Sequence, residues 1–94
     1  MPETLDVNQQ NAQTSEIDIV GSSRVAIFAK PLSGVIKQVM LNIQISPDGV
    51  GWYNYTSFNP GRYQVFDVLG DSVRLRVTET ASQPAEIELF FVTG

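Results

Sequence analysis

Short runs of alternating apolar and polar residues dominate this sequence. In the run VIKQVMLNIQIS (35–46), Val39, Leu41, Ile43 and Ile45 fall on one side of a strand and the residues between them on the other. A period of two residues is typical of a half-buried β-strand, whereas an amphipathic helix repeats after about 3.6 residues. Because no segment shows a convincing helical period, we predict an all-β protein.

Turn-forming residues separate the predicted strands at near-regular spacing. PLSG (31–34), NPGR (59–62), Gly70-Asp71 and TASQP (80–84) are rich in the residues that favour turns. The strands predicted between them cover residues 24–30, 35–46, 52–58, 63–69, 72–79 and 85–92. With EIDIV (16–20) as an added edge strand, about six to eight short strands indicate an antiparallel β-sandwich or a jelly-roll-like barrel.

The composition argues against catalysis and against several kinds of ligand. The chain of 94 residues contains no histidine and no cysteine, which removes the commonest general base and the commonest nucleophile pairs. Its net charge of −4 suits a nucleic-acid phosphate backbone poorly. No apolar run approaches the ~20 residues of a membrane span, and no dense acidic loop resembles a calcium site. We therefore expect no enzyme activity, cofactor, metal, nucleic acid or membrane partner.

Two regions of different character divide the chain. Residues 1–22 contain four acidic and no basic residues and include the polar run NQQNAQTS (8–15), whereas residues 23–94 carry the predicted β-sandwich and are neutral. A polar segment that cannot bury its own apolar surface is normally ordered by a partner. We therefore expect an extended N-terminal arm that lies on another chain, with an arm docked on its own chain as the alternative. Its contact residues would be Glu3, Leu5, Asp6, Val7, Ile17 and Ile19.

The stretch SPDGVGWYNY (46–55) combines a Pro-Asp-Gly turn with Trp52, Tyr53 and Tyr55. One interpretation is a hairpin loop with half-buried aromatic side chains. The other is a carbohydrate platform or an aromatic hot spot at an interface. The spacing Ser-x-Asp-Gly-x-x-Trp also resembles the Asp-box turn of sialidase-like propellers, which stabilises a hairpin and does not imply catalysis.

Charged residues alternate with apolar ones on two of the predicted strands. Arg74 and Arg76 would pair with Glu86 and Glu88 if the last two strands were neighbours. A second hypothesis is that both arginines receive the acidic arm Glu3–Asp6 of a neighbouring subunit.

Some apolar residues occur on the strand face where polar residues are expected. Phe90 and Val92 point away from Ile87 and Leu89, and Met40 lies opposite Leu41. A second apolar face on so short a chain favours contacts between subunits, and a sheet covered by its own loops is the alternative.

The pattern QISPDGVGWYNY…VLGDSVRLRVTE, behind a polar N-terminal arm, resembles small virion proteins of tailed bacteriophages, over roughly residues 35–80. The capsid decoration (cement) type implies a homo-oligomer, often a trimer, on the outer capsid surface. The resemblance also implies a major capsid protein or another virion protein as the partner, and a soluble chain in the host cytoplasm before assembly. Carbohydrate-binding or host-adhesion sandwiches, and tail or neck adaptors, are the alternatives.

Overall fold

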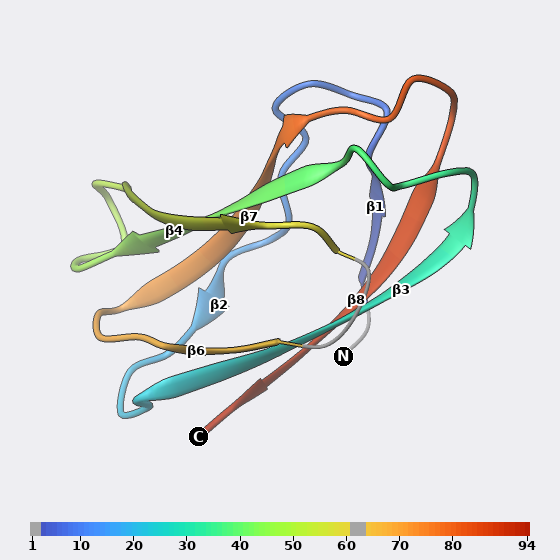
Figure 1. Ribbon diagram of the computed structural model, residues 1–94. Coiled ribbons are helices and arrows are strands. Elements are labelled where there is room, and N and C mark those ends of the chain that lie inside the picture. The colour runs from blue at the N-terminus through green and yellow to red at the C-terminus, as the bar shows by residue number, and fades with distance from the viewer. Residues whose placement is uncertain (1–2, 61–63) are drawn as a thin grey trace.

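The protein is described here by a computed structural model that covers residues 3–60 and 64–94. Eight strands form two four-stranded antiparallel sheets (Figure 1). The strands are β1 (Glu3–Asp6), β2 (Ile17–Asp18), β3 (Arg24–Ser33), β4 (Met40–Ser46), β5 (Tyr53–Phe58), β6 (Gln64–Asp67), β7 (Ser72–Glu79) and β8 (Glu86–Thr93). The predicted all-β sandwich is thus confirmed, and no helix of the described residues is long and apolar enough to cross a membrane.

The strand order is that of a jelly roll. Sheet A has the order β1-β8-β3-β6 and sheet B the order β2-β7-β4-β5, so the first strand pairs with the last, the second with the seventh, and so on inward. This pattern arises when a long antiparallel ribbon folds over into two packed sheets. Sequence periodicity predicts the strands but not this order, because alternation does not say which strand pairs with which.

The core lies between the inner faces of the two sheets. Sheet B contributes Leu41 and Ile43 from β4 and Leu75 from β7, while sheet A contributes Ile27 from β3 and Leu89 from β8; all five are fully buried. Fully burying an aliphatic side chain of this size is worth about 1.5–3 kcal/mol. The predicted inward side of the alternating runs is therefore the core side.

The N-terminal segment differs from the expected arm. β1 pairs with β8 at the edge of sheet A, and β2 pairs with β7 at the edge of sheet B. Leu5, Val7 and Ile19 are buried in the core of the same chain, and Ile17 packs against that core. Residues 3–22 therefore belong to the sandwich instead of lying on another chain, because the apolar side chains of this segment complete the core between the two sheets.

The polar run NQQNAQTS reaches the sandwich through its backbone. The amide of Asn11 donates to the carbonyl of Val77 (3.1 Å), and the amide of Val77 donates to the carbonyl of Ala12 (2.8 Å). The buried hydroxyl of Thr14 also accepts a hydrogen bond from the amide of Leu75 (3.0 Å). Backbone pairing does not require apolar side chains, which is why hydropathy gives no sign of it.

The chain between β3 and β4 also departs from the predicted boundaries. β3 continues through the predicted turn to Ser33, with an irregularity in its pairing to β8 between Pro31 and Ser33. β4 starts only at Met40, and the side-chain amide of Asn59 donates to the carbonyls of Ile36, Lys37 and Val39 in the preceding loop. The rest of the predicted NPGR turn, beyond Pro60, and Tyr63 lie outside the described residues.

Three loops meet at one end of the sandwich, on the left in Figure 1. We call this the loop end; it consists of residues 19–23, 47–52 and 68–71. The amide of Ile19 donates to the carbonyl of Asp71 (2.9 Å), and the amide of Asp71 donates to the carbonyl of Ser46 (2.8 Å). These bonds join the loops 19–23 and 68–71 to each other and to the end of β4, from which the loop 47–52 leaves.

Candidate functional site on the outer face of sheet A

The outer face of sheet A carries a band of apolar side chains. In the β-ladder, Phe28 of β3 is paired with Phe90 of β8, and Ala26 is paired with Val92 on one side and with Val65 of β6 on the other. These five residues are called the apolar face. They alternate with the core residues of the same strands, so they project away from the core.

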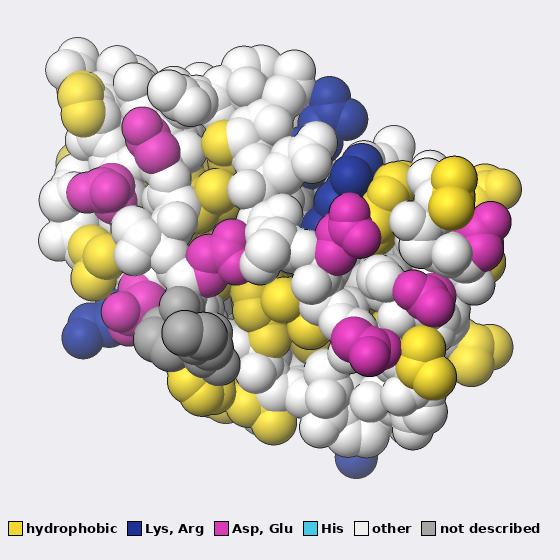
Figure 2. Space-filling model, turned by 180° about the vertical axis from the view of Figure 1, so that it is seen from behind, with side chains coloured by type: hydrophobic (Ala, Val, Ile, Leu, Met, Phe, Trp, Pro, Cys, Tyr) yellow, Lys and Arg dark blue, Asp and Glu magenta, His cyan; other side chains and the backbone are white. Residues whose placement is uncertain are grey.

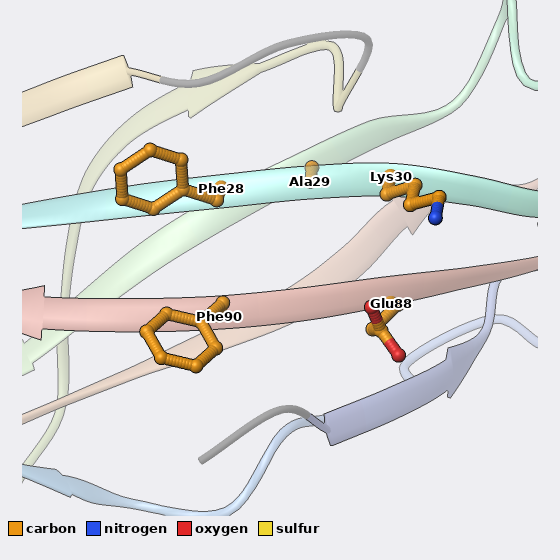
Figure 3. Close-up of a pocket in the computed structure, with 5 residues that line it drawn as sticks. All are labelled: Phe28, Ala29, Lys30, Glu88 and Phe90. Carbon is orange, nitrogen blue, oxygen red and sulfur yellow. The ribbon is translucent and has the colours of Figure 1, made fainter.

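The two phenyl rings form the centre of the apolar face. Their centroids are 6.4 Å apart at an interplanar angle of 75°, an edge-to-face arrangement. Each ring is 42% exposed, and Val65 and Val92 are exposed to a similar degree. Figure 3 shows the rings on neighbouring strands, with Lys30 and Glu88 beside them further along. These four residues and Ala29 line a shallow pocket.

Charged residues flank the apolar face at both ends. Lys30 is paired with Glu88 at one end, and Arg24 is paired with Asp67 at the other. An exposed apolar area bordered by polar residues is typical of a protein interaction site. This surface thus combines apolar side chains at its centre with charged side chains of both signs at its margins.

Phe90 and Val92 therefore lie on the outer side of β8, as the alternation predicts. Met40 does not join them, because it is the first residue of β4, in the other sheet, opposite Glu79. Phe28 and Val65 complete the apolar face but were not predicted from the sequence. The run RVAIFAK is apolar at most positions, so its outer side could be recognised only from the register with β8.

The outer face of sheet B is polar by contrast. The guanidinium Nε of Arg74 donates to Gln44 (2.7 Å), whose side-chain amide donates to Asn54 (3.0 Å), so one hydrogen-bonded row crosses three strands. The guanidinium carbon of Arg74 also lies 4.1 Å from the ring centroid of Trp52. One face of the Trp52 ring is thus occupied by a cation of the same chain.

The three candidate aromatic residues do not form one platform. Trp52 lies beside Arg74, whereas Tyr53 is paired with Ile45, whose side chain packs against the core. Tyr53 and Tyr55 are exposed on β5, which is an edge strand. The irregular pairing of β4 with β5 after Ile43 interrupts the alternation that the sequence suggested.

The predicted pairing of Arg74 and Arg76 with Glu86 and Glu88 is wrong, because β7 and β8 belong to different sheets. Arg76 instead donates from Nε and Nη2 to the side-chain oxygen of Asn11 (3.1 and 2.7 Å). The N-terminal segment does reach this arginine, but within its own chain and through a neutral amide.

The acidic residues of the N-terminal segment also contact their own chain. Glu3 accepts hydrogen bonds from the amide and the hydroxyl of Ser15 (2.9 and 2.6 Å). Asp6 accepts a bond from the amide of Asn8 (2.9 Å). These carboxylates thus hold the connection between β1 and β2.

Asp48 organises the hairpin that precedes Trp52. Its Oδ1 accepts hydrogen bonds from the amides of Val50 (2.9 Å) and Gly51 (3.0 Å), which hold the pKa of Asp48 below its ordinary value of 3.8. The buried hydroxyl of Ser46 accepts a further bond from the amide of Gly49 (2.7 Å). The Asp-Gly turn is thus structural, and the described residues contain no cluster of three or more side chains suited to a metal.

The effect of Asp48 on stability should depend on pH. Since its pKa is lowered in the folded state, the stabilisation is present above about 3.8 and is lost as the pH falls through the lower folded value. Asp48→Ala should therefore lower the Tm at pH 6, and the difference from wild type should shrink below pH 3.8. Thermal melts between pH 2 and 7 measure this. The difference between Asp48→Ala and Asp48→Asn should not vary with pH, because neither residue titrates.

The loop end presents a second group of exposed apolar side chains. Val20, Val50 and Leu69 are 66%, 83% and 89% exposed, one on each of the three loops. Asp48 and Asp71 lie in two of these same loops. Figure 2 shows hydrophobic and acidic side chains gathered at its right-hand end, which is the loop end seen from behind.

No family model and no curated protein matches this chain. Among the solved structures that resemble it in fold are a mitogen and a prophage-derived protein. The Yersinia pseudotuberculosis-derived mitogen has a TM-score of 0.70 and 12% identity, over 100% of this chain and 85% of the mitogen. The SPBc2 prophage-derived protein YomS has a TM-score of 0.61 and 10% identity, over 100% of this chain and 96% of YomS. At such low identity, the similarities establish a shared β-sandwich fold.

Proposed function

We propose that this protein is a non-enzymatic structural protein of a bacteriophage virion, which stabilises the capsid by oligomerising on its outer surface. The observation that carries the proposal is the apolar face, in which two paired phenylalanines stand in a band of exposed apolar residues. A face of this kind is costly in a monomer and useful in an assembly. The absence of histidine and cysteine from the chain argues for binding over catalysis.

The structure changes which residues we assign to self-association and which to attachment to the capsid. The N-terminal segment is committed to the sandwich, so it does not bridge to neighbours. We assign self-association to the apolar face and attachment to the major capsid protein, or to another virion protein, to the loop end. Exposed aliphatic side chains on three joined loops suit such attachment.

Two further observations bear on a phage origin of the protein and on the alternative of carbohydrate binding. One structural neighbour is prophage-derived, which is in keeping with a phage protein, although that likeness concerns the fold. A carbohydrate-binding role has less support, because Arg74 covers one face of Trp52 and Tyr53 lies apart from it.

The proposal is tested on phage particles from the strain that carries the gene. Particles bearing an epitope-tagged chain are purified on a density gradient, and the chain is quantified against the major capsid protein by mass spectrometry. We expect a fixed ratio in filled heads and surface labelling by immunogold electron microscopy. Recovery of the chain only in the particle-free fractions would contradict the proposal.

A double variant at the loop end, compared with a control variant, locates the attachment surface in the same experiment. The double substitution Val50→Asp and Leu69→Asp should abolish recovery in the particles, because both side chains are exposed at the loop end. Val35→Asp is the matched control, since Val35 is 68% exposed in the loop between β3 and β4, at the opposite end of the sandwich. Equal loss with both variants would contradict attachment through the loop end.

A further inference from the structure

We infer that the occupant of the apolar face is a second copy of this chain, placed by a two-fold axis that runs along β3 and β8. The inference deepens the proposed function by naming the partner and the residues in contact. It rests on three pairs across these two strands: Lys30 with Glu88, Phe28 with Phe90, and Ala26 with Val92.

Each of these pairs on one copy is complementary to the same pair on the second copy. A two-fold axis between β3 and β8, parallel to them, lays β3 of one copy over β8 of the other without shifting positions along the strands. Lys30 then faces the partner's Glu88, Phe28 faces the partner's Phe90, and Ala26 faces the partner's Val92. Every contact occurs twice, as an isologous interface requires, and strands of stacked sheets run within about 30° of each other.

The charges distinguish this arrangement from the other face-to-face one. A two-fold axis across the strands would lay β3 over β3 in reverse order. Lys30 would then approach the partner's Arg24, because these residues flank the apolar face at its two ends. Like charges brought together at an interface are costly, whereas the axis along the strands brings opposite charges together.

The outer face of sheet A has two pockets that can receive side chains of the second copy. The pocket lined by Phe28, Ala29, Lys30, Glu88 and Phe90 lies beside the phenyl rings (Figure 3), and Arg24, Ala26, Val65, Val92, Thr93 and Gly94 line a second one. The axis along the strands also leaves the loop ends of both copies on the same side of the dimer. Two equivalent loop ends facing one way would bind a shell with avidity.

The test exchanges the charges of Lys30 and Glu88 in the full-length chain. Sedimentation velocity over a concentration series gives the mass, which should be that of a dimer for the wild type. K30E and E88K should each raise the dimer Kd at least about tenfold, because each places two like-charge pairs in the interface. Mixing the two variants should restore a heterodimer. In it, the carboxylate introduced by K30E faces the ammonium introduced by E88K, and the unchanged Glu88 of the first chain faces the unchanged Lys30 of the second.

The mixture separates contacts between chains from contacts within one chain. An ion pair confined to one chain would not be restored by mixing, since neither variant holds an opposite-charge pair at these positions. Native mass spectrometry of isotopically labelled K30E with unlabelled E88K identifies the heterodimer directly. K37E serves as the matched control, because it makes the same charge change at an exposed residue outside the sheets and should leave the dimer intact.

A wild-type chain that is a monomer or a trimer would overturn this inference, as would single variants that dimerise normally. The trimer implied by the phage resemblance would use a different contact, because a three-fold interface is not isologous. A trimer that is recovered on phage heads would leave the proposed function standing, whereas a monomer on phage heads would keep the virion location and contradict the oligomerisation. A dimer that is absent from phage heads would overturn the proposed function and leave the two-fold contact standing.

Discussion

Deleting residues 1–22 should unfold the protein. The deletion removes β1 and β2 and with them the buried side chains of Leu5, Val7 and Ile19. Truncating a single buried leucine or isoleucine to alanine costs about 2–5 kcal/mol, and a whole domain has only about 5–15 kcal/mol of stability. Losing three such side chains together with the pairing partners of β7 and β8 should exceed that margin.

Circular dichroism and thermal unfolding of the chain that starts at Ser23 measure this effect. The single substitutions Leu5→Ala and Ile19→Ala should each destabilise by about 2–5 kcal/mol. Val20→Ala, in the same segment but largely exposed, should cost little. A shortened chain that keeps a cooperative transition at the wild-type temperature would show that the segment is an independent arm, as the sequence suggested.

The second large effect is expected for Gly34→Ala. Gly34 has a φ of +80°, and a Cβ at this position would lie 2.6 Å from both the Cβ of Ala85 and the carbonyl oxygen of Pro84. Left-handed backbone in a residue other than glycine costs roughly 1–3 kcal/mol, and overpacking adds roughly another 1–3 kcal/mol. Since about 1 kcal/mol shifts the Tm of so small a domain by roughly 4–8 °C, the Tm should fall by at least about 8 °C.

Gly21→Ala provides the control for Gly34→Ala. Gly21 has nearly the same φ, +81°, but a Cβ there would have no atom within 4 Å. It should show the backbone cost alone, so the difference between the two variants in Tm reports the close packing of the loop after β3 against the loop before β8. Equal losses of Tm would mean that this packing adds nothing.

Both effects have the same origin in the jelly-roll topology. The strand order brings the N-terminal strand against the C-terminal one and places the loop after β3 on the chain before β8. Contacts between distant parts of the sequence therefore hold the domain together. Removing either end of the chain removes part of both the core and the ladders.

The sequence by itself determined the fold class and the orientation of several side chains. Alternation in the runs of β4, β7 and β8 predicts strands with Leu41, Ile43 and Leu75 inward and Phe90 and Val92 outward. Such predictions succeed because the side-chain period of a strand is a local property. The Asp48 turn was equally readable, since its hydrogen bonds join residues two or three apart.

Only the tertiary structure decided which strands are neighbours, and the candidate site depends on that. The apolar face exists because the register sets Phe28 beside Phe90. The expected arm is part of the sandwich because its apolar side chains are buried in the core and its strands pair with β7 and β8. Arg74 and Glu86 are kept apart for the same reason, since their strands belong to different sheets. Strand pairing depends on contacts between residues distant in the sequence and on the burial of apolar side chains from the whole chain. No local pattern of residues encodes it.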